Sequence, residues 1–410
     1  MRQPMEGVRV LEVAQFTYVP SSGAVLADWG ADVIKIEHAE SGDAQRGLVR
    51  VLGLDAAAPG VNFFPIMEGP NRGKRSLGIT LGSPEATEIL HALVRNSDVF
   101  VTNFLPGARQ RAGIDLDQIR AVNPDIIYVR GTGFGNKGPE RDAGGYDATG
   151  FWARSGVAEV MTPPEAEMLT SQPTGAFGDN IGGMTIAGGI AAALFKRATT
   201  GETSVVDVSL LSVGAWATQM STNLAMVVGG NLPRMALGTG NTPRNPVSMP
   251  YKTKDGRWIQ LCMLQAGKYW PEVCRVIERP DLITDVRFAD ATSVVMNGAD
   301  AAAIIAGIFL TKTQAEWIEI LADMDGQWSP VQNFWEVAHD QSLRANGLIA
   351  QVTDADGHPR ELVLNPVLFD ETPPVIDRAP QFAEHTDEIL AGIGISDERV
   401  LELKIAGIVT

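Results

Sequence analysis

The sequence predicts an α/β fold, with a Rossmann-like parallel sheet in a large first domain and a smaller α+β domain after it. Residues 8–13 and 33–37 read as strands, and a helical run at 23–29 lies between them. A strand–helix–strand unit of this kind needs parallel strands. The chain has 410 residues, more than one core usually holds, which favours two or three domains.

Strands and helices keep alternating up to residue 228. A helix that starts at Ser83 is marked by the Ser-Pro-Glu start signal and by the helical spacing of Ile89 and Leu93. The other strands are expected at 76–80, 98–101, 126–129 and 204–210, and the helices at 83–96, 116–122, 146–156, 184–195 and 211–228. Ligands bind beyond the carboxyl ends of such strands, so the loops after residues 13 and 37 are candidate walls of a site.

Composition changes after residue 228. Gly, Asn and Pro are abundant at 229–250, which is typical of a linker. A hairpin follows at 251–263, with Asp255 and Gly256 at its turn. The predicted domains are therefore 1–228 (large), 229–250 (linker), 251–330 (small, α+β) and 331–410 (a second linker and a C-terminal return). In these last two parts helices are expected at 270–277, 301–310, 313–324, 340–347, 384–393 and 396–406, and a hairpin around 354–357.

The charge balance excludes several classes of partner. The net charge is −16, from 33 basic and 49 acidic residues. A nucleic-acid binder or a protein that binds anionic membranes needs the opposite charge balance, so neither nucleic acid nor a membrane is expected as a partner.

The only cysteines, Cys262 and Cys274, are too few and too far apart for a zinc motif or a disulfide framework. We expect no metal, no membrane span and a cytoplasmic location.

Asp179 is the most informative acidic residue. It lies in the glycine-rich stretch 174–183, where an Asp is usually a turn residue. The small, apolar run 184–195 reads as a buried helix, which places Asp179 near a helix N-terminus. The free N–H groups there favour an anion, so Asp179 is either an ordinary N-cap or a candidate nucleophile.

Basic residues gather near the exits of the first strands. They are either solvated loop charges or a cradle for a polyphosphate group. The six residues are Arg46, Arg72, Lys74, Arg75, Arg109 and Arg111. Residues 133–138 also match the pattern G-x-G-x-x-G, but Pro139 follows instead of a helix. A turn-rich loop that lines a site therefore fits residues 133–138 better than a nucleotide fingerprint.

Together these motifs resemble those of the class III CoA-transferases, a family that also contains 2-methylacyl-CoA racemases. The resemblance covers nearly the whole chain. It rests on Gly7-Val-Arg-Val-Leu-Glu12, Gly30-Ala-Asp-Val-Ile-Lys-Ile-Glu37, Ser41-Gly42-Asp43, Asn71-Arg-Gly-Lys-Arg-Ser76, Asn103-Phe104, Pro106-Gly107, Gly133-Phe-Gly, Gly138-Pro139, Gly178-Asp179, Gly183-Met184 and Glu384-His-Thr-Asp-Glu388. Ala383 stands where the family usually has Gly.

The resemblance implies both a fold and a site. The fold would be a large Rossmann-like domain built from both chain ends, a smaller domain between them, and an interlocked-ring homodimer. Asp179 would be the catalytic residue and coenzyme A the cofactor, carried as an acyl-CoA substrate. The positions implied to contact CoA are Phe16, Thr17, His38, Lys74, Asn103, Phe104 and Arg111. At His38 some family members have Arg instead.

The implied reaction moves CoA from an acyl-CoA donor to a carboxylic acid through an aspartyl anhydride and an aspartyl-CoA thioester. Two alternatives stay open. A racemase would need a proton shuttle where this chain has Tyr146, in Gly145-Tyr146-Asp147, and where Gln265 replaces a Glu. A tyrosine with a pKa of ~10 is a poor shuttle near neutrality, which favours the transferase. The second alternative is a non-catalytic CoA binder in which Asp179 is only an N-cap.

Overall fold

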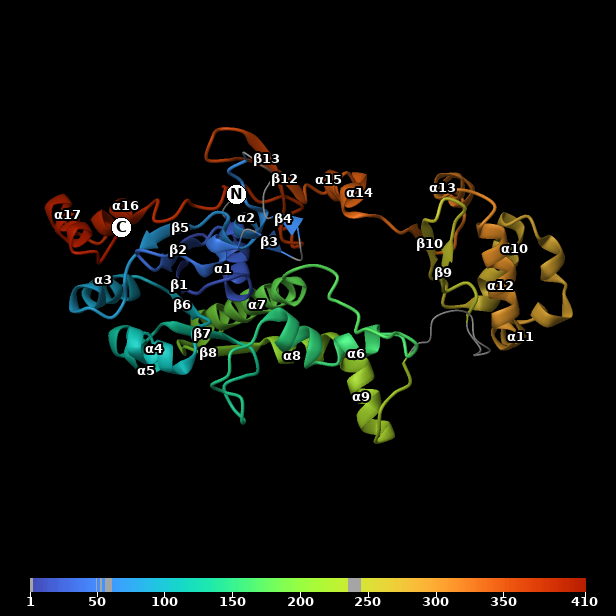
Figure 1. The fold of residues 1–410 in the computed structure, drawn as a ribbon, viewed down its shortest axis with the longest axis horizontal. Helices are drawn as coiled ribbons and strands as arrows, with labels where there is room; N and C mark the ends of the chain where they lie inside the picture. Colours follow the sequence, from blue (N-terminus) through green and yellow to red (C-terminus); the bar gives the residue numbers. More distant parts are fainter. Residues whose placement is uncertain (1–2, 49, 52–53, 56–60, 235–244) are drawn as a thin grey trace. The chain divides into compact units, whose positions relative to one another are not determined.

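Six parallel strands form the central sheet (Figure 1). The structure is a computed structural model that describes residues 3–48, 50–51, 54–55, 61–234 and 245–410. The strands are β1 (Arg9–Val13), β2 (Asp32–Glu37), β5 (Arg75–Gly78), β6 (Val99–Thr102), β7 (Ile127–Thr132) and β8 (Val205–Ser209). Their order across the sheet is β5-β2-β1-β6-β7-β8. This is the doubly wound Rossmann order, and it reverses direction between β1 and β6. The predicted α/β class and parallel sheet are confirmed.

Helices cover both faces of this sheet, because successive side chains of a strand point to opposite faces. Val10 and Val99 pack under one layer, and Leu11 and Phe100 pack under the other. The first layer contains α1 (Tyr18–Asp28), α7 (Phe177–Thr200) and α8 (Leu210–Ala217). The second contains α3 (Pro84–Arg95), α5 (Leu116–Val122), α16 (Thr386–Gly392) and α17 (Asp397–Ile405).

The C-terminal segment joins the sheet built by the N-terminal segment. The backbone N–H of Thr80 donates to the carbonyl of Ile408 at 2.8 Å, and that of His385 donates to Ser76 at 3.0 Å. The side chain of Asn365 donates to Asp28 on α1 at 2.8 Å. These bonds explain why α16 and α17, the last helices of the chain, lie beside α3 (Figure 1).

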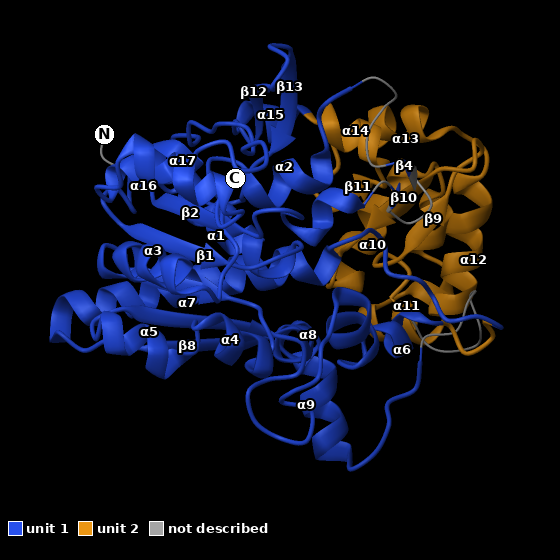
Figure 2. Ribbon diagram, turned by 60° about the vertical axis from the view of Figure 1, so that its left-hand side comes forward, with its two compact units in different colours: residues 1–162, 167–234, 341–410 blue, residues 163–166, 235–340 orange. Residues whose placement is uncertain are grey.

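The chain divides into two compact units (Figure 2). Unit 1 comprises residues 1–162, 167–234 and 341–410, and unit 2 comprises residues 163–166 and 235–340. Part of the expected linker, residues 235–244, lies outside the described residues. Unit 2 holds a three-stranded antiparallel sheet in the order β11-β10-β9, with Trp317 stacked on Phe309 in its core at 4.3 Å between ring centroids.

The elements of unit 2 have the following bounds: β9 (Pro250–Lys252), β10 (Trp258–Leu261), α10 (Ala266–Val276), η3 (Pro280–Ile283), η4 (Val286–Phe288), α11 (Ala291–Met296), α12 (Gly298–Phe309), α13 (Gln314–Leu321), β11 (Trp328–Pro330) and α14 (Phe334–Ala338). The remaining elements of unit 1 are η1 (Ala44–Gly47), β3 (Arg50–Val51), β4 (Leu54–Asp55), α2 (Pro65–Asn71), α4 (Pro106–Ala112), η2 (Asp147–Ala153), α6 (Val157–Met161), α9 (Gln219–Val228), α15 (Gln341–Ala345), β12 (Ile349–Thr353) and β13 (Pro359–Val363).

Several helices differ from their predictions. The helix expected at 23–29 begins earlier, at Tyr18, which shortens the loop after β1. The single helix expected at 211–228 is two helices, α8 and α9, which are separated at Thr218. The helix expected at 184–195 begins earlier, at Phe177, so Asp179 lies inside its first turn. The helix expected at 146–156 is a short π-helix, η2. Among the described residues, no helix is both long enough and apolar enough to cross a membrane.

Candidate active site

A cavity of about 460 Å³ opens at the point where the strand order reverses. Its walls are the loops after β1 and β6, the end of β7, the loop that precedes η2, and the first turn of α7. The lining residues that matter below are Gln15, Phe16, Tyr18, Asn103, Phe104, Gly131, Gly133, Tyr146 and Asp179. This is where a doubly wound sheet is expected to bind its ligand. The prediction that residues near 133 form a site-lining loop is confirmed for Gly133.

Asp147, and not Asp179, caps the N-terminus of α7. Both carboxylate oxygens of Asp147 accept the backbone N–H of Gly178, at 3.1 and 3.2 Å. Burial raises the pKa of Asp147, against backbone hydrogen bonds from Gly178, Asp179 and Phe177. The helix begins after Ala176, whose φ is 60°. The view of Asp179 as a plain N-cap is therefore wrong, and its side chain is left to face the cavity.

Asp179 is a poorly solvated carboxylate. Burial, and secondly the nearby charge of Asp147, raise the pKa of Asp179 from 3.8 to about 7. Desolvation disfavours the charged form of a carboxyl group, and a second negative charge adds to the effect. A carboxylate without its hydration shell is a stronger nucleophile than one in water. The pKa shift is also the kind that clusters at functional sites.

The glycines around Asp179 make room for the protein's own side chains. A Cβ on Gly178 would lie 2.2 Å from Phe151, one on Gly182 would lie 2.3 Å from Tyr18, and one on Gly183 would lie 2.5 Å from Ser21. The absence of side chains at these positions lets α7 pack tightly on α1 and η2, which fixes the position of Asp179.

The loops at the switch point are tied together by one side chain. Asn103 accepts the backbone N–H of Gln15 at 3.1 Å and donates to the carbonyl of Gln15 at 2.7 Å. Beside it, Phe16 has a φ of 64°, which is unusual for a residue other than glycine. The Phe16 N–H donates to Asp43 at 3.0 Å, and this bond helps to hold that conformation. The rings of Phe16 and Tyr146 pack edge to face, with 5.3 Å between their centroids.

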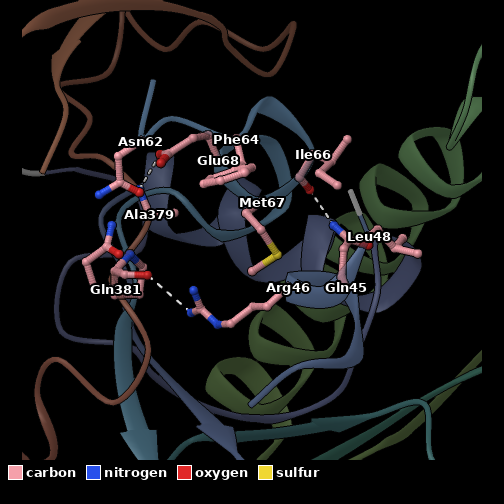
Figure 3. Close-up of a pocket in the computed structure, with 11 residues that line it drawn as sticks. Gln45, Arg46, Leu48, Asn62, Phe64, Ile66, Met67, Glu68, Ala379 and Gln381 are labelled. Atoms are coloured by element: carbon pink, nitrogen blue, oxygen red, sulfur yellow. Dashed lines mark hydrogen bonds between the residues drawn. The ribbon is translucent and has the colours of Figure 1, made fainter. Parts of the chain in front are cut away.

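A second, smaller cavity of about 100 Å³ is lined by residues of η1, of α2 and of the segment 379–381 (Figure 3). Figure 3 shows its polar wall, in which Ala379 donates to Glu68 at 2.7 Å, Arg46 donates to Pro380 at 3.2 Å, and Gln45 donates to Ile66. Gln45 also accepts the hydroxyl of Thr17 at 2.8 Å. These bonds turn the Thr17 side chain away from the 460 Å³ cavity and support the strained turn.

Lys74, an expected CoA contact, is buried in the core of unit 1. The residue is 3% exposed, and its ammonium donates to both oxygens of Glu12, at 2.9 and 2.8 Å. It also donates to the carbonyl of Pro20 at 2.8 Å and to Asn71 at 3.2 Å. Burial lowers the pKa of Lys74 to about 8, against the opposing effect of Glu12. The donors of Lys74 are taken up inside the protein, so we leave it out of the proposed CoA site.

Most of the basic cluster is neutralised in the same way. Arg46 pairs with Glu37, Arg72 with Asp28, Arg75 with Asp32 and Arg109 with Asp115, at 2.6 to 2.9 Å. Among the described residues, Arg111 is the member of the six without an ion-pair partner, and it is exposed on α4. The polyphosphate cradle suggested by the sequence is thereby reduced to Arg111.

Some of the expected site residues line the cavity of Asp179, and others lie outside it. The structure brings Phe16, Asn103, Phe104 and Asp179 together in one cavity. His38 is exposed after β2 and its Nδ1 accepts the N–H of Glu40 at 3.3 Å, outside that cavity. Gln265 is exposed at the start of α10 in unit 2. Sequence reasoning missed Gln15 and Tyr18, although both lie in the strand exit already marked as a site wall.

One group in the described residues has the spacing to hold a metal. Ligand atoms of Asp354, Asp356 and His358 lie within 4.8 Å of one another at the turn between β12 and β13. Asp354 already accepts the N–H groups of Asp356 and His358 and pairs with Arg360 at 2.8 Å. These bonds are those of a stabilised turn, and the group lies outside the cavity of Asp179.

A doubly wound sheet with a desolvated aspartate at its switch point defines an α/β enzyme of the Rossmann type. Comparison with known proteins narrows this class. Residues 5–386 match the model of CoA-transferase family III, and the chain belongs to that family.

Relatives and solved structures agree with this assignment. The chain is 34% identical to (R)-2-hydroxy-4-methylpentanoate CoA-transferase of Clostridioides difficile, over 99% of both chains. It is 30% identical to cinnamoyl-CoA:phenyllactate CoA-transferase of Clostridium sporogenes, over 97% of this chain and 95% of that one. The crystal structure of a CAIB/BAIF family protein from Brucella suis superposes with a TM-score of 0.81 at 25% identity, covering 96% of this chain and all of that one.

The chain is therefore a CoA-transferase, an enzyme that transfers CoA between an acyl-CoA and a carboxylic acid. This confirms the resemblance seen in the sequence. It also decides among the functions left open. Both relatives named above are CoA-transferases, which selects the transferase over the racemase and over the non-catalytic binder.

Proposed function

We propose that Asp179 is the nucleophile of the transfer. The observation that carries this proposal is its place in the cavity, as a desolvated carboxylate whose helix is capped by another residue. Its carboxylate attacks the donor thioester, forming a C–O bond and breaking the C–S bond. CoA thiolate leaves and an aspartyl anhydride remains. The thiolate then attacks the Asp179 carbonyl, which releases the donor acid and leaves an aspartyl-CoA thioester.

The second half of the reaction reverses these steps on the acceptor. The acceptor carboxylate attacks the thioester carbonyl of Asp179 and expels CoA thiolate. The thiolate attacks the acyl carbonyl of the new anhydride, which yields the product acyl-CoA and restores the Asp179 carboxylate. All electrons and protons balance without a metal or an external oxidant.

CoA is proposed to bind along the carboxyl edge of the sheet. Phe16 and Phe104 offer apolar walls, Asn103 fixes the loop between them, and Arg111 supplies the cation for a phosphate group. A guanidinium that is free of carboxylate partners suits this role. Contacts of CoA with Thr17 and His38 remain predictions of the resemblance.

The acceptor is proposed to be a 2-hydroxy carboxylic acid, because two of the relatives are named for such acids. The test is a screen of acyl-CoA donors against pairs of acids that differ only in the 2-hydroxyl group, with products measured by mass spectrometry. A consistent preference for the hydroxylated member supports the proposal, and equal use of both members contradicts it.

The nucleophile is tested by trapping. The enzyme is incubated with acyl-CoA and then with hydroxylamine, and the site of the hydroxamate is found by peptide mass spectrometry. We expect modification at Asp179 and its loss in Asp179→Ala. A hydroxamate on another residue, or transfer activity that survives in Asp179→Ala, would contradict this role. Asp117→Ala, at an exposed residue of α5, serves as the control.

The homodimer implied by the resemblance is part of the same proposal. The helix α9 has no buried residue, and its apolar side chains Met220, Leu224, Met226, Val227 and Val228 are 49% to 84% exposed. An apolar patch of this kind marks an interaction surface. A second copy of this chain is proposed to cover it, in the interlocked-ring arrangement of the family.

Sedimentation of the wild type and of Met226→Glu tests the dimer. We expect a dimer that dissociates in the variant, whereas Leu401→Glu, at an apolar residue 60% exposed on α17, keeps it. A monomeric wild type would contradict the proposal.

A cytoplasmic location is also proposed, supported by the free thiols of Cys262 and Cys274.

A further inference from the structure

The ring of Tyr18 is clamped between two glycines. Tyr18 is the first residue of α1 and is only 6% exposed. A Cβ on Gly182, on α7, would lie 2.3 Å from its Cε2, and a Cβ on Gly131, at the end of β7, would lie 3.0 Å from its Cε1. The ring therefore occupies a slot that exists because Gly182 lacks a side chain, and Gly131 lies close to the other edge of the ring. This slot fixes where the hydroxyl lies.

That hydroxyl has no partner. Among the described residues, no hydrogen-bonding atom meets the buried Oη of Tyr18. Buried polar atoms are nearly always paired, so an exception points to a missing partner. The contrast with Tyr128 is informative, because its hydroxyl donates to the carbonyl of Ile114 at 2.7 Å. Tyr18 instead lines the cavity that also contains Asp179.

The proposed reaction needs a hydrogen-bond donor beside the carbonyl of Asp179. In a tetrahedral intermediate the oxygen of the attacked carbonyl becomes an oxyanion, which preorganised donors stabilise. The N–H groups at the start of α7 would be the obvious donors. They are directed to the Asp147 carboxylate instead, with Gly178 at 3.1 Å. The backbone of the first turn is therefore occupied.

We propose that the Tyr18 hydroxyl is a catalytic hydrogen-bond donor to the carbonyl oxygen of Asp179. It acts in the two steps in which the Asp179 carbonyl itself is attacked, once by CoA thiolate on the anhydride and once by the acceptor carboxylate on the thioester. The hydroxyl donates a hydrogen bond and keeps its proton, so no proton is transferred. The inference rests on the proposed role of Asp179 as the nucleophile.

The hydroxyl is suited to remain a donor. Burial, and secondly the charge of Asp179, raise the pKa of Tyr18 well above its ordinary value of 10.0. It therefore stays protonated near neutral pH. Asp179 acts on Tyr18 electrostatically without a hydrogen bond between them in the described structure, which leaves the donor free for the covalent intermediate.

Tyr18→Phe is the direct test, because it removes only the hydroxyl and keeps the ring in its slot. We expect kcat to fall about 100-fold, as for the loss of an oxyanion donor. The KM for acyl-CoA should change less than about threefold, because the lost interaction forms only in the transition state. In single turnovers, intact-protein mass spectrometry should show slower attachment of CoA to Asp179. The melting temperature should not fall, since no hydrogen bond is lost.

Tyr128→Phe is the matched control and should give the opposite result. It removes a hydroxyl that is hydrogen-bonded in the helix layer containing α3 and α5, so stability should fall while kcat stays within about twofold. A Tyr18→Phe enzyme with kcat within about twofold of the wild type would overturn the proposal. A rise in KM with unchanged kcat would also overturn it. Asp179→Ala separates the two hypotheses: if it retains transfer activity, the nucleophile itself is wrong, whereas an inactive Asp179→Ala with a fully active Tyr18→Phe refutes only the donor.

Discussion

The carboxylate of Asp147 accepts the backbone N–H of Gly178 through both oxygens, at 3.1 and 3.2 Å, one residue before Asp179. This places a second negative charge beside the proposed nucleophile. The charge of Asp147 is the second cause, after burial, of the raised pKa of Asp179. The cap of α7 therefore both positions Asp179 and tunes its ionisation.

The first prediction concerns the pH dependence of the reaction. Only ionised Asp179 is a nucleophile, so kcat/KM should rise with pH to a plateau, with a midpoint at about 7. Asp147→Asn keeps one acceptor oxygen but removes the charge, so the pKa of Asp179 should fall and the midpoint should move to lower pH. Asp117→Asn, at an exposed residue of α5, should leave the profile unchanged. A midpoint that does not move in Asp147→Asn would show that the charge of Asp147 has no such effect.

The second prediction concerns stability at high pH. The pKa of Asp179 rises from 3.8 to about 7 on folding, so between these values the folded state holds a proton that the unfolded state has released. Stability therefore falls as pH rises through this window and stays lower above it. Asp179→Asn carries no charge at any pH. It should be more stable than the wild type by about 2–4 kcal/mol above pH ~7, with no difference below pH ~4.

Urea denaturation at several pH values measures this effect. The control is Asp207→Asn. Asp207 lies on β8, and its carboxylate pairs with Arg130 at 2.6 Å. Its variant should gain no stability at high pH. A destabilised Asp179→Asn at high pH would contradict a desolvated carboxylate at this position.

The third prediction separates two roles for Lys74. Its ammonium pairs with the buried Glu12 at 2.8 Å. In Lys74→Met, Lys35 at 3.2 Å is the one cation left beside that carboxylate among the described residues, so the free energy of unfolding should fall by about 3–5 kcal/mol. The exposed Lys137, changed to Met, should have no such effect. If Lys74→Met keeps its stability but raises the KM for acyl-CoA, the residue contacts the cofactor as the resemblance implied.

The fourth prediction concerns Arg111. Arg111→Ala should raise the KM for acyl-CoA about tenfold with little change in kcat, because a phosphate contact far from the thioester binds substrate and transition state alike. The effect should shrink at high salt, since exposed charges are screened. The control is Arg95→Ala, at the last residue of α3, which leads into the amino end of the neighbouring strand β6. Equal KM values for the two variants would contradict a CoA contact at Arg111.

Most of the fold could be predicted from local patterns in the sequence. The alternation of strands and helices gave the parallel sheet, because each element is marked by its own side-chain period. The break at Thr218 was missed, since residues on both sides are apolar and continue the helical pattern. The short helix α4 was missed because Pro106–Ala112 contains no large apolar side chain that could show a helical period.

The candidate site was predicted less completely, because its key contacts join distant residues. Asp179 and the loop after β1 were predicted from their positions along the chain. The loop after β2, predicted as a wall together with it, does not line the cavity of Asp179, and Asn103 and Phe104 after β6 were named only through the family resemblance. The partner of Lys74 is 62 residues away in the sequence, and the carboxylate that caps α7 is 31 residues before Gly178. No local pattern marks such pairs. The basic cluster therefore looked available for a ligand until its acidic partners were known.

The slot around Tyr18 links two positions that are far apart in the chain. A methyl group at residue 182 would lie 2.3 Å from the ring, and a smaller side chain at residue 18 would leave a void between α1 and α7. We therefore expect residues 18 and 182 to co-vary among family members. An alignment sorted by the residue at position 18 would then divide the family according to how each enzyme supplies its donor.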